Sequence, residues 1–588
     1  MGAEGVSAGG AHGGPRAGEG EGAADAFRVV IVGAGPAGLV LANLLLTRGG
    51  GRFHVSVIEK GEDPRAEVEE AAEIARGRGS EVKATPSGVQ RVMVNPHEMV
   101  MPAFGRLLRF PIPKDPPQGL VSRTDLCGAL LEALLETATK GDKNEAAVGS
   151  NRDEEKEDGE KARVVQQKHL KQHLSRHLAV YFESRVVDVD MKRHVVTAAV
   201  PCGSGSGSGS EGSSSSEGNN STGGSSNGSS SSSRGDSSID AGGIGLKTVQ
   251  LKYDLLVGAD GVRSYVRNLL ASQTWDFPMH TDRVYHDWTV VNVPVPPALT
   301  PTSLFFAAKV PNTQGIGTVA MPLVSGEHCL VWGWKSTDPP LDWLSLPSAA
   351  AAKQYLDDRL PWLDVPEDAA WKLLKQKPRT NMQVKCWRYH DTAAQVALIG
   401  DAAHSTLPSL GQGCNASITD ALVLGRLLLG EAVSEQDRVP HPLGKQGGVS
   451  SGEGDGLASG GGDSGGGCQV EPPEPEKLRA ALPDILSTYS ALQVVEGHAL
   501  VDLSDAAAPV SAFYTFLFTM DLVIRSILCK LLPWFVSQPI QGLCGNTTLP
   551  YSSILGKFRG FVSRVVRANA AQRWDWVVQR YKKTIPRR

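Results

Sequence analysis

A glycine-rich turn near the start of the chain has the residue types and spacing of a site for a nucleotide phosphate. It contains Gly33, Gly35 and Gly38. The turn lies between the β-branched run Phe27–Val32 and the Leu- and Ala-rich segment Leu39–Arg48. Glycines here let the backbone approach a pyrophosphate, and N–H groups at the start of the following helix attract its charge. Glu59 ends the next β-branched run, where a carboxylate can bind a ribose. This order predicts a dinucleotide-binding unit rather than a turn that binds nothing.

Two later motifs add carboxylates and tight turns that could extend such a site. The first contains Asp260, Gly261 and Arg267. The second contains Gly400, Asp401, Gly411, Gly413, Cys414 and Asn415. A carboxylate at a strand end can hold the hydroxyls of a ribityl chain, and a helix N-terminus can stabilise negative charge on a reduced isoalloxazine ring. His404, within the second motif, is interpreted as structural rather than catalytic.

In this order the motifs resemble those of the FAD-dependent aromatic hydroxylases, the class A flavoprotein monooxygenases. The matching segments are GAGPAG, SRTDL, GADGVRSYVR and GDAAHSTLPSLGQGCN. Within that family the chain is most similar to the kynurenine 3-monooxygenases. The similarity continues through Asn381–Leu428 and into a C-terminal region that contains Gln572–Val577.

The resemblance implies a cofactor, a mechanism and a set of binding residues. NADPH, or NADH, would reduce FAD, and O2 would then add to the flavin as a C4a-hydroperoxide that hydroxylates a small aromatic substrate. The chemistry would belong to the flavin, so we expect no catalytic side chain and no metal. Besides the glycines, the FAD contacts carried over by position are Ala37, Glu59, Lys60, Arg123, Val187, Asp401, Cys414 and Asn415. Asp260, Gly261 and Arg267 belong to the family's second fingerprint, on the nucleotide and NADPH side.

The substrate side departs from the kynurenine hydroxylase pattern of an Arg, two Tyr and an Asn. The residues expected near the pocket are Arg91, Phe110, Pro408 and Cys544. Phe110 and Cys544 stand where Tyr is expected, and Ala506–Ala508 lies where Asn is expected. A carboxylate buried without polar partners is costly. The sequence therefore predicts a more apolar substrate than kynurenine.

Other functions remain open at this level. Trp332 and Trp334 form a Trp-x-Trp motif like that of flavin halogenases on the same fold, although two Trp on one strand are more often core residues. A reductase of a lipid-like substrate is a further alternative. A non-catalytic FAD-binding scaffold is the alternative from another class, and it would show no NADPH-dependent oxygen uptake.

The elements that must position these residues predict an α/β protein with an α+β second lobe. A doubly wound, Rossmann-type FAD domain would carry an antiparallel substrate sheet and a C-terminal helical region. We expect the FAD domain to comprise residues 27–75, 120–275 and 389–429. The substrate lobe would comprise 76–119 and 276–388, and the helical region 478–588. Expected strands include Leu178–Val189, Val195–Val200, Thr248–Leu251 and Tyr253–Val257.

Composition sets the remaining limits. Low-complexity stretches over residues 1–26, 141–163, 201–245 and 430–477 have no core to bury, so we expect them to be disordered. A net charge of −4 argues against a globally basic nucleic-acid binder. Eight scattered cysteines fit a reducing compartment. No secretory signal is recognisable, which predicts a cytoplasmic protein or one peripheral on an intracellular membrane.

Two C-terminal features bear on a membrane. Ala506–Met520 is apolar but is expected to be too short to span a bilayer. The basic C-terminus contains Phe558, Phe561, Val562, Val565 and Val566 at helical spacing. They predict either a membrane-surface helix or a docked helix with a solvated basic face.

Overall fold

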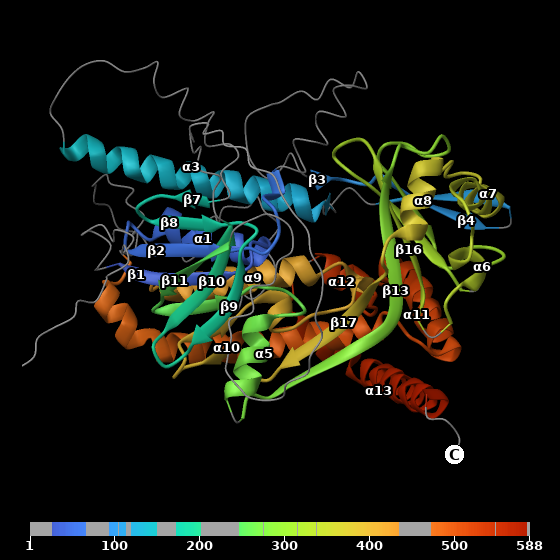
Figure 1. The fold of residues 1–588 in the computed structure, drawn as a ribbon. Helices are drawn as coiled ribbons and strands as arrows, with labels where there is room; N and C mark the ends of the chain where they lie inside the picture. The colour runs from blue at the N-terminus through green and yellow to red at the C-terminus, as the bar shows by residue number, and fades with distance from the viewer. Residues whose placement is uncertain are drawn as a thin grey trace, which may run out of the picture.

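The computed structural model describes residues 26–65, 93–149, 172–201, 246–433 and 472–584, apart from 104, 113–118, 275, 314, 337 and 547–548. A parallel sheet forms one end of the molecule (Figure 1). Its order is β18-β19-β12-β1-β2-β8-β7, with antiparallel partners only at its two edges. The strands are β1 (Phe27–Val32), β2 (Phe53–Ile58), β7 (Gln172–Leu174), β8 (Leu178–Tyr181), β12 (Leu255–Gly258), β18 (His390–Asp391) and β19 (Val396–Leu398). Their continuous apolar runs are buried on both faces, as a parallel sheet requires.

Helices cover this sheet and connect its strands. Helix α1 packs between α3 and α9, and its first turn lies directly after β1. The helices of this domain are α1 (Pro36–Arg48), α3 (Arg123–Gly149), α5 (Tyr265–Gln273) and α9 (Gly413–Leu428). The short 3-10 turns η3 (Gly400–Ala402) and η4 (Pro408–Leu410) precede α9. The prediction of a doubly wound domain is confirmed, because β1 pairs in parallel with both β2 and β12.

A small antiparallel sheet of β9 (Arg185–Asp190), β10 (Val195–Pro201) and β11 (Leu246–Lys252) lies beside the parallel sheet. The prediction of one strand over Leu178–Val189 is wrong. The chain turns at Glu183, where φ is +50°, and the two halves join different sheets. The expected strands Thr248–Leu251 and Tyr253–Val257 correspond to β11 and β12, which lie in different sheets, because β11 pairs with β10 whereas β12 pairs with β1 and β19.

A second seven-stranded sheet, in the order β17-β13-β16-β15-β14-β4-β5, forms the other lobe. All its pairings are antiparallel except β14 with β4. The strands are β4 (Glu98–Ala103), β5 (Arg106–Pro111), β13 (Met279–Val293), β14 (Ser303–Ala307), β15 (Gly317–Pro322), β16 (His328–Lys335) and β17 (Arg379–Cys386). The two-stranded pair of β3 (Met93–Val94) and β6 (Leu120–Val121) is separate. Helices α6 (Leu341–Leu344), α7 (Ala349–Arg359) and α8 (Glu367–Lys375) complete this lobe. The largely antiparallel second sheet confirms the prediction.

Four C-terminal helices join the two lobes. They are α10 (Pro475–Ala506), α11 (Ala512–Leu531), α12 (Ile540–Asn546) and α13 (Tyr551–Thr584). Helix α10 contacts β1 of the parallel sheet, α9, η4 and β17 of the second sheet, and it packs along α13. Figure 1 shows α11 and α13 at the end of the molecule that carries the second sheet. The helical region therefore closes over the junction between the lobes.

The structure decides or corrects several expectations about the C-terminal region and the low-complexity insertions. Phe558, Val562 and Val565 are buried, so α13 is a docked helix and this face is not available to a membrane. The apolar segment predicted to be too short continues through Asp521 as the 20-residue helix α11. Within the described part of the chain, α11 is the helix long and apolar enough to cross a membrane by length and composition. Helix α3 extends to Gly149, into the predicted insertion 141–163. The other low-complexity stretches lie mostly outside the described residues.

Candidate functional site

The glycine turn between β1 and α1 is fixed by close backbone packing. Gly33 has φ +109°, and a Cβ there would lie 2.4 Å from the carbonyl oxygen of Ala259. A Cβ on Gly38 would lie 2.2 Å from the carbonyl oxygen of Gly33. Gly35 is the N-cap of α1 and provides no side-chain cap, so the first N–H groups of the helix keep their capacity to bind an anion. The structure thus requires glycine at positions 33 and 38, two of the three positions of the phosphate motif.

Glu59 links the turn to the end of β2. Its Oε2 accepts a hydrogen bond from the Ala34 N–H at 2.8 Å, and its Oε1 accepts one from the Gly61 N–H at 2.8 Å. Each carboxylate oxygen keeps a lone pair for a further donor, such as a ribose hydroxyl. Lys60, the next residue, has an exposed side chain. The carboxylate is therefore held at the carboxyl edge of the parallel sheet, where ligands of such folds bind.

Arg123 and Asp401 lie in the same neighbourhood, although they come from distant parts of the sequence. The Arg123 Nη2 lies 3.5 Å from the position that a Cβ on Gly35 would occupy. Asp401 is exposed to solvent, yet the surrounding protein desolvates its carboxylate and raises its pKa, against the opposing charges of His404, Arg123 and Arg267. An exposed carboxylate that is also strongly desolvated lies in a recess rather than on a convex surface.

Cys127 and Cys414 extend this neighbourhood. Burial raises the pKa of the Cys127 thiol to about 11, and Arg123, Cys414 and Glu59 all act on it electrostatically. Burial likewise raises the pKa of Cys414, with Asp401 adding to the shift and Arg123 opposing it. Both thiols are therefore protonated near neutral pH and carry no charge in the recess.

The turns before α9 complete the recess. Gly400 has φ +60°, and a Cβ there would meet the Ser417 Oγ at 2.7 Å and the Ala37 Cβ at 3.6 Å. Gly411 has φ +64° and ends η4, two residues before α9 begins at Gly413. These contacts place the second strand-end motif directly against the first turn of α1.

The Asp260 motif forms the third wall. The Asp260 Oδ2 accepts hydrogen bonds from the N–H groups of Tyr265 at 2.6 Å and Val266 at 3.3 Å, whereas the buried Asp260 Oδ1 has no partner. Burial raises the pKa of Asp260, against the hydrogen bonds to Ser264 and the backbone. Gly261 follows with φ +79°. Val187 is nearby, since its carbonyl accepts a hydrogen bond from the Tyr265 hydroxyl at 3.2 Å, and its side chain is exposed.

Arg267 is placed differently from the other predicted cofactor residues. Its side chain is 2% exposed and donates to the carbonyl oxygens of Ala402 at 3.0 Å and Val262 at 2.8 Å. The guanidinium therefore ties the Asp260 motif to η3 from inside the protein.

Asp420 is a residue of this region that sequence reasoning missed. Its Oδ2 lies 2.6 Å from the His404 Nε2 and accepts a hydrogen bond from the Gly400 N–H at 2.7 Å. Burial alone would lower the pKa of His404, but the Asp420 carboxylate outweighs it and raises that pKa. The pair is buried beside Tyr389, whose ring stacks on that of His404. The structural interpretation of His404 agrees with this geometry.

The C-terminal helices contact the cofactor-side turn through Gln412. Its Oε1 accepts hydrogen bonds from the Asn415 Nδ2 at 3.0 Å and from the Tyr551 hydroxyl at 3.1 Å. The next residue, Ser552, donates to the Glu496 Oε1 at 2.5 Å. Helices α9, α10 and α13 are thereby joined at the N-terminus of α9. No sequence pattern reveals these long-range partners.

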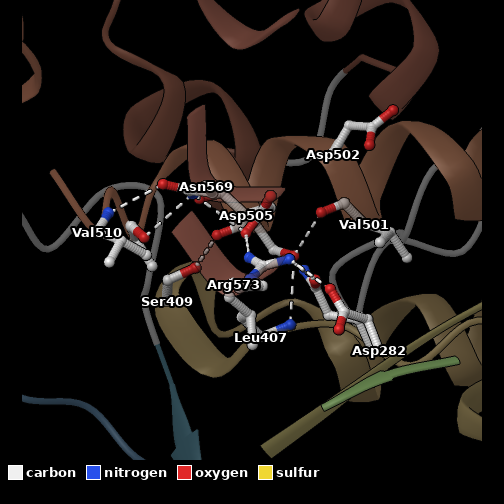
Figure 2. A network of polar contacts seen from close by, with 12 residues as sticks. Asp282, Leu407, Ser409, Val501, Asp502, Asp505, Val510, Asn569 and Arg573 are labelled. Atoms are coloured by element: carbon white, nitrogen blue, oxygen red, sulfur yellow. Dashed lines mark hydrogen bonds and ion pairs between the residues drawn. The ribbon is translucent and has the colours of Figure 1, made fainter. Parts of the chain in front are cut away.

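A buried polar network fixes the same helices to the second sheet (Figure 2). Arg573 of α13 contacts Asp505 of α10, and its Nη1 donates to the Asp282 Oδ2 at 2.9 Å and to the Gln383 Oε1 at 3.0 Å. Asn569 of α13 donates to the backbone and side-chain oxygens of Asp505 at 3.0 and 3.2 Å.

The loop before α9 is tied to this network through α10. The Ser409 hydroxyl donates to the carbonyl oxygen of Ser504 at 2.6 Å, and the Leu407 N–H donates to the Ser504 Oγ at 3.2 Å. Ser504 immediately precedes Asp505 in α10. The position of the η4 loop therefore depends on contacts made across both lobes.

The four predicted pocket residues do not come together as one group. Pro408 lies on η4, and Cys544 lies on α12, which packs against η4. Cys544 is 1% exposed within the helical core, whereas Phe110 is 48% exposed on the edge strand β5. Arg91 lies outside the described residues. The junction of η4 with α12 and α13 is thus the part of the predicted pocket that the structure assembles.

The Trp-x-Trp motif belongs to the core of the second lobe. Trp332 is fully buried and Trp334 is 2% exposed. Trp332 packs against Trp343 with ring centroids 5.5 Å apart. The structure confirms the core interpretation of this motif.

The residues present fit a dinucleotide that carries a ring with developing negative charge. The Gly33 and Gly400 turns exclude a Cβ and lie against Asp260 and Ala37, with the unpartnered Asp260 Oδ1 and the desolvated Asp401 beside them. Comparison with known proteins gives the same answer, because the family described as "FAD binding domain" matches residues 26–201 and 242–437. The chain belongs to this FAD-binding family. FAD is therefore its cofactor.

Individual relatives match a shorter segment. Kynurenine 3-monooxygenase from Flavobacterium psychrophilum is 28% identical over 194 residues, which are 30% of this chain and 39% of that protein. Violacein synthase from Chromobacterium violaceum is 29% identical over 197 residues, 30% of this chain and 42% of that protein. A solved structure of 2-methyl-3-hydroxypyridine-5-carboxylic acid oxygenase covers 88% of this chain and 96% of its own, with 14% identity and a TM-score of 0.43. The resemblance to kynurenine 3-monooxygenases is thus confirmed, over less than half of their length.

Proposed function

We propose that the chain is an FAD-dependent, NAD(P)H-consuming monooxygenase that hydroxylates a small aromatic or related organic substrate. The observation that carries the proposal is the convergence of the three motifs on one recess at the N-terminus of α9, closed by the C-terminal helices. Several curated relatives bear the name kynurenine 3-monooxygenase, which supports the reaction class.

The binding roles follow from the positions of the residues. Gly33, Gly35 and the first turn of α1 would bind the pyrophosphate, and Glu59 the ribose. Asp401 would hold the ribityl hydroxyls. FAD, when bound, supplies the exchange of electrons with NAD(P)H and the activation of O2. The proposed contacts of Lys60 and Val187 remain predictions of the resemblance.

The protein contributes positioning and electrostatics at the ring site. Gln412, the N-cap of α9, makes no side-chain cap, so the N–H groups of the first turn can stabilise negative charge. The Asn415 and Tyr551 hydrogen bonds hold the Gln412 amide in place. The helical region over η4 would exclude water from the reacting centre.

The substrate is proposed to be less polar than kynurenine. The helical core beside η4 is built from apolar residues, among them Ile540, Cys544 and the partly buried Leu410. A zwitterionic group would lose its hydration there without gaining paired hydrogen bonds. Neutral phenols or indoles fit this environment better.

The test uses the purified full chain loaded with FAD. NADPH and NADH oxidation, O2 uptake and product mass would be measured with a panel of aromatic acids, phenols, indoles and kynurenine. We expect substrate-stimulated O2 uptake and a product that carries one oxygen atom from labelled O2. Absence of uptake with every compound would favour the scaffold alternative, and a halogenated product in the presence of halide would favour a halogenase. Efficient coupled hydroxylation of kynurenine would refute the apolar substrate class.

A further inference from the structure

An apolar face with no protein partner in the described structure runs along α11 and the turn that follows it. None of the 20 residues of α11 is buried. The exposed large apolar side chains are Phe513, Phe516, Met520, Val523, Ile524, Ile527, Leu531, Leu532, Trp534 and Phe535. Those within the helix recur at spacings of three and four residues, so they form one stripe. Trp534 and Phe535 are 91% and 87% exposed, which is rare for aromatic side chains of this size.

The opposite face of α11 fixes the helix to the protein. The ring of Phe518 stacks on that of Phe561 of α13, with centroids 6.4 Å apart. Arg525 lies over the ring of Phe558 at 5.0 Å and pairs with Asp521 at 2.7 Å. These two contacts, seven residues apart in α11, hold the helix against α13 and leave the apolar stripe facing outward. The helix therefore cannot cross a bilayer without leaving α13.

The charge around the stripe indicates what covers it. Residues 512–570 contain six Lys or Arg and a single acidic residue, Asp521, although the whole chain has a net charge of −4. Lys530, Lys557, Arg559, Arg564 and Arg567 are exposed. A second copy of the chain would bring two such basic surfaces together, which like-charge repulsion opposes. A surface that is apolar at its centre, basic at its edge and carries Trp at one end matches an anionic lipid bilayer.

We propose that α11 and the Leu532–Phe535 turn dock the protein on an anionic membrane surface, with α11 lying in the plane of the lipid headgroups. The apolar stripe would enter the boundary between headgroups and acyl chains, and the basic side chains would contact lipid phosphates. The apolar stripe of α11 is separate from the apolar residues of α13 that the sequence indicated, whereas most of the basic residues at its edge belong to α13. The proposal is independent of the monooxygenase reaction.

The test is flotation of the FAD-loaded full chain with vesicles. Vesicles of phosphatidylcholine alone would be compared with vesicles that contain about one-third phosphatidylserine. We expect flotation with the anionic vesicles and little with the neutral ones. A triple variant with Phe516→Ser, Ile527→Ser and Trp534→Ser should lose flotation, while FAD content and melting temperature stay unchanged because these side chains are exposed.

Two further variants distinguish the contribution of the α11 stripe from that of other exposed apolar residues and from that of the basic side chains. Val324→Ser with Leu341→Ser removes exposed apolar residues from the second lobe, at 45% and 65% exposure, and should leave flotation unchanged. Lys530→Gln with Lys557→Gln should weaken binding by about fivefold per charge at low salt. Absence of flotation with anionic vesicles, or equal flotation with neutral ones, would overturn the proposal. A lipid-free dimer that the triple variant abolishes would overturn it in favour of a second copy.

Discussion

Arg573→Met should destabilise the attachment of the C-terminal helices, because it removes the cation of a buried network. Arg573 is 6% exposed and Asp505 is 3% exposed. The change leaves the Asp505 carboxylate with only neutral donors, chiefly Asn569. Breaking a buried ion pair by removing one partner costs about 3–5 kcal/mol. The free energy of unfolding should fall by about that amount near pH 7.5, measured by urea denaturation.

The loss should depend on pH in a defined direction. Burial already raises the pKa of Asp505 even though Arg573 opposes the shift, so removing Arg573 raises it further. The folded variant then takes up a proton at a pH where the unfolded chain remains ionised. Stability is therefore lost as pH rises through the raised pKa and recovered as pH falls toward the unfolded value of 3.8. The difference between variant and parent should shrink by half or more at about pH 4.5.

The control is the same substitution on the exposed face of the same helix. Arg567 is exposed, and its Nε donates to the carbonyl oxygen of Ser563, so Arg567→Met should change stability by less than about 0.5 kcal/mol. Asp505→Asn combined with Arg573→Met should recover part of the loss, because the uncompensated charge is gone. A loss below about 1 kcal/mol for Arg573→Met, or an equal loss at both pH values, would refute this account.

Two further predictions concern the FAD domain. Gly33→Ala should abolish FAD binding, measured by flavin absorbance of the purified protein, because the added Cβ meets the Ala259 carbonyl oxygen at 2.4 Å and φ is +109°; yellow protein with full FAD content would contradict this. Burial opposes ionisation of Asp254, but its hydrogen bonds with Arg28 and Arg479 prevail and lower its pKa to about 2. This carboxylate therefore contributes about 2 kcal/mol of stability above pH 4, which is lost as pH falls from 4 through 2. Asp254→Asn should remove that part of the acid dependence of the unfolding free energy, measured by urea titration. An unchanged loss of stability between pH 4 and pH 2 would contradict this prediction.

Local sequence patterns predicted the FAD-binding turn well, because the physics there is local. A short stretch of chain contains the run Phe27–Val32, the glycine turn and Glu59, so the direction of each element limits where the following one can lie. The same holds for Trp332 and Trp334, whose alternation on a strand predicted the core position that they occupy. Asp401 and Arg123 could be assigned to the same site only through the family resemblance.

Strand partners could not be predicted with the same success. Leu178–Tyr181 and Arg185–Asp190 are separated by only three residues, yet one joins the parallel sheet and the other the small antiparallel sheet. The turn at Glu183 that separates them uses a positive φ on a residue with no glycine signal. The apolar segment was expected to end at Met520, whereas α11 continues to Leu531 with Asp521 and Arg525 paired one turn apart.

By itself, the sequence determined the two-lobed architecture and the glycines of the first turn, since these depend on periodicity and backbone freedom along the chain, whereas the cofactor class followed from the family resemblance. Tertiary structure alone decided which distant residues complete the site. Asp420 holds the Gly400 turn, Tyr551 holds Gln412, and Arg573 joins the C-terminal helices to Asp282 of the second sheet across a sequence separation of 291 residues. It also decided that α11 carries its apolar stripe outward, because burial depends on which faces the other helices leave uncovered.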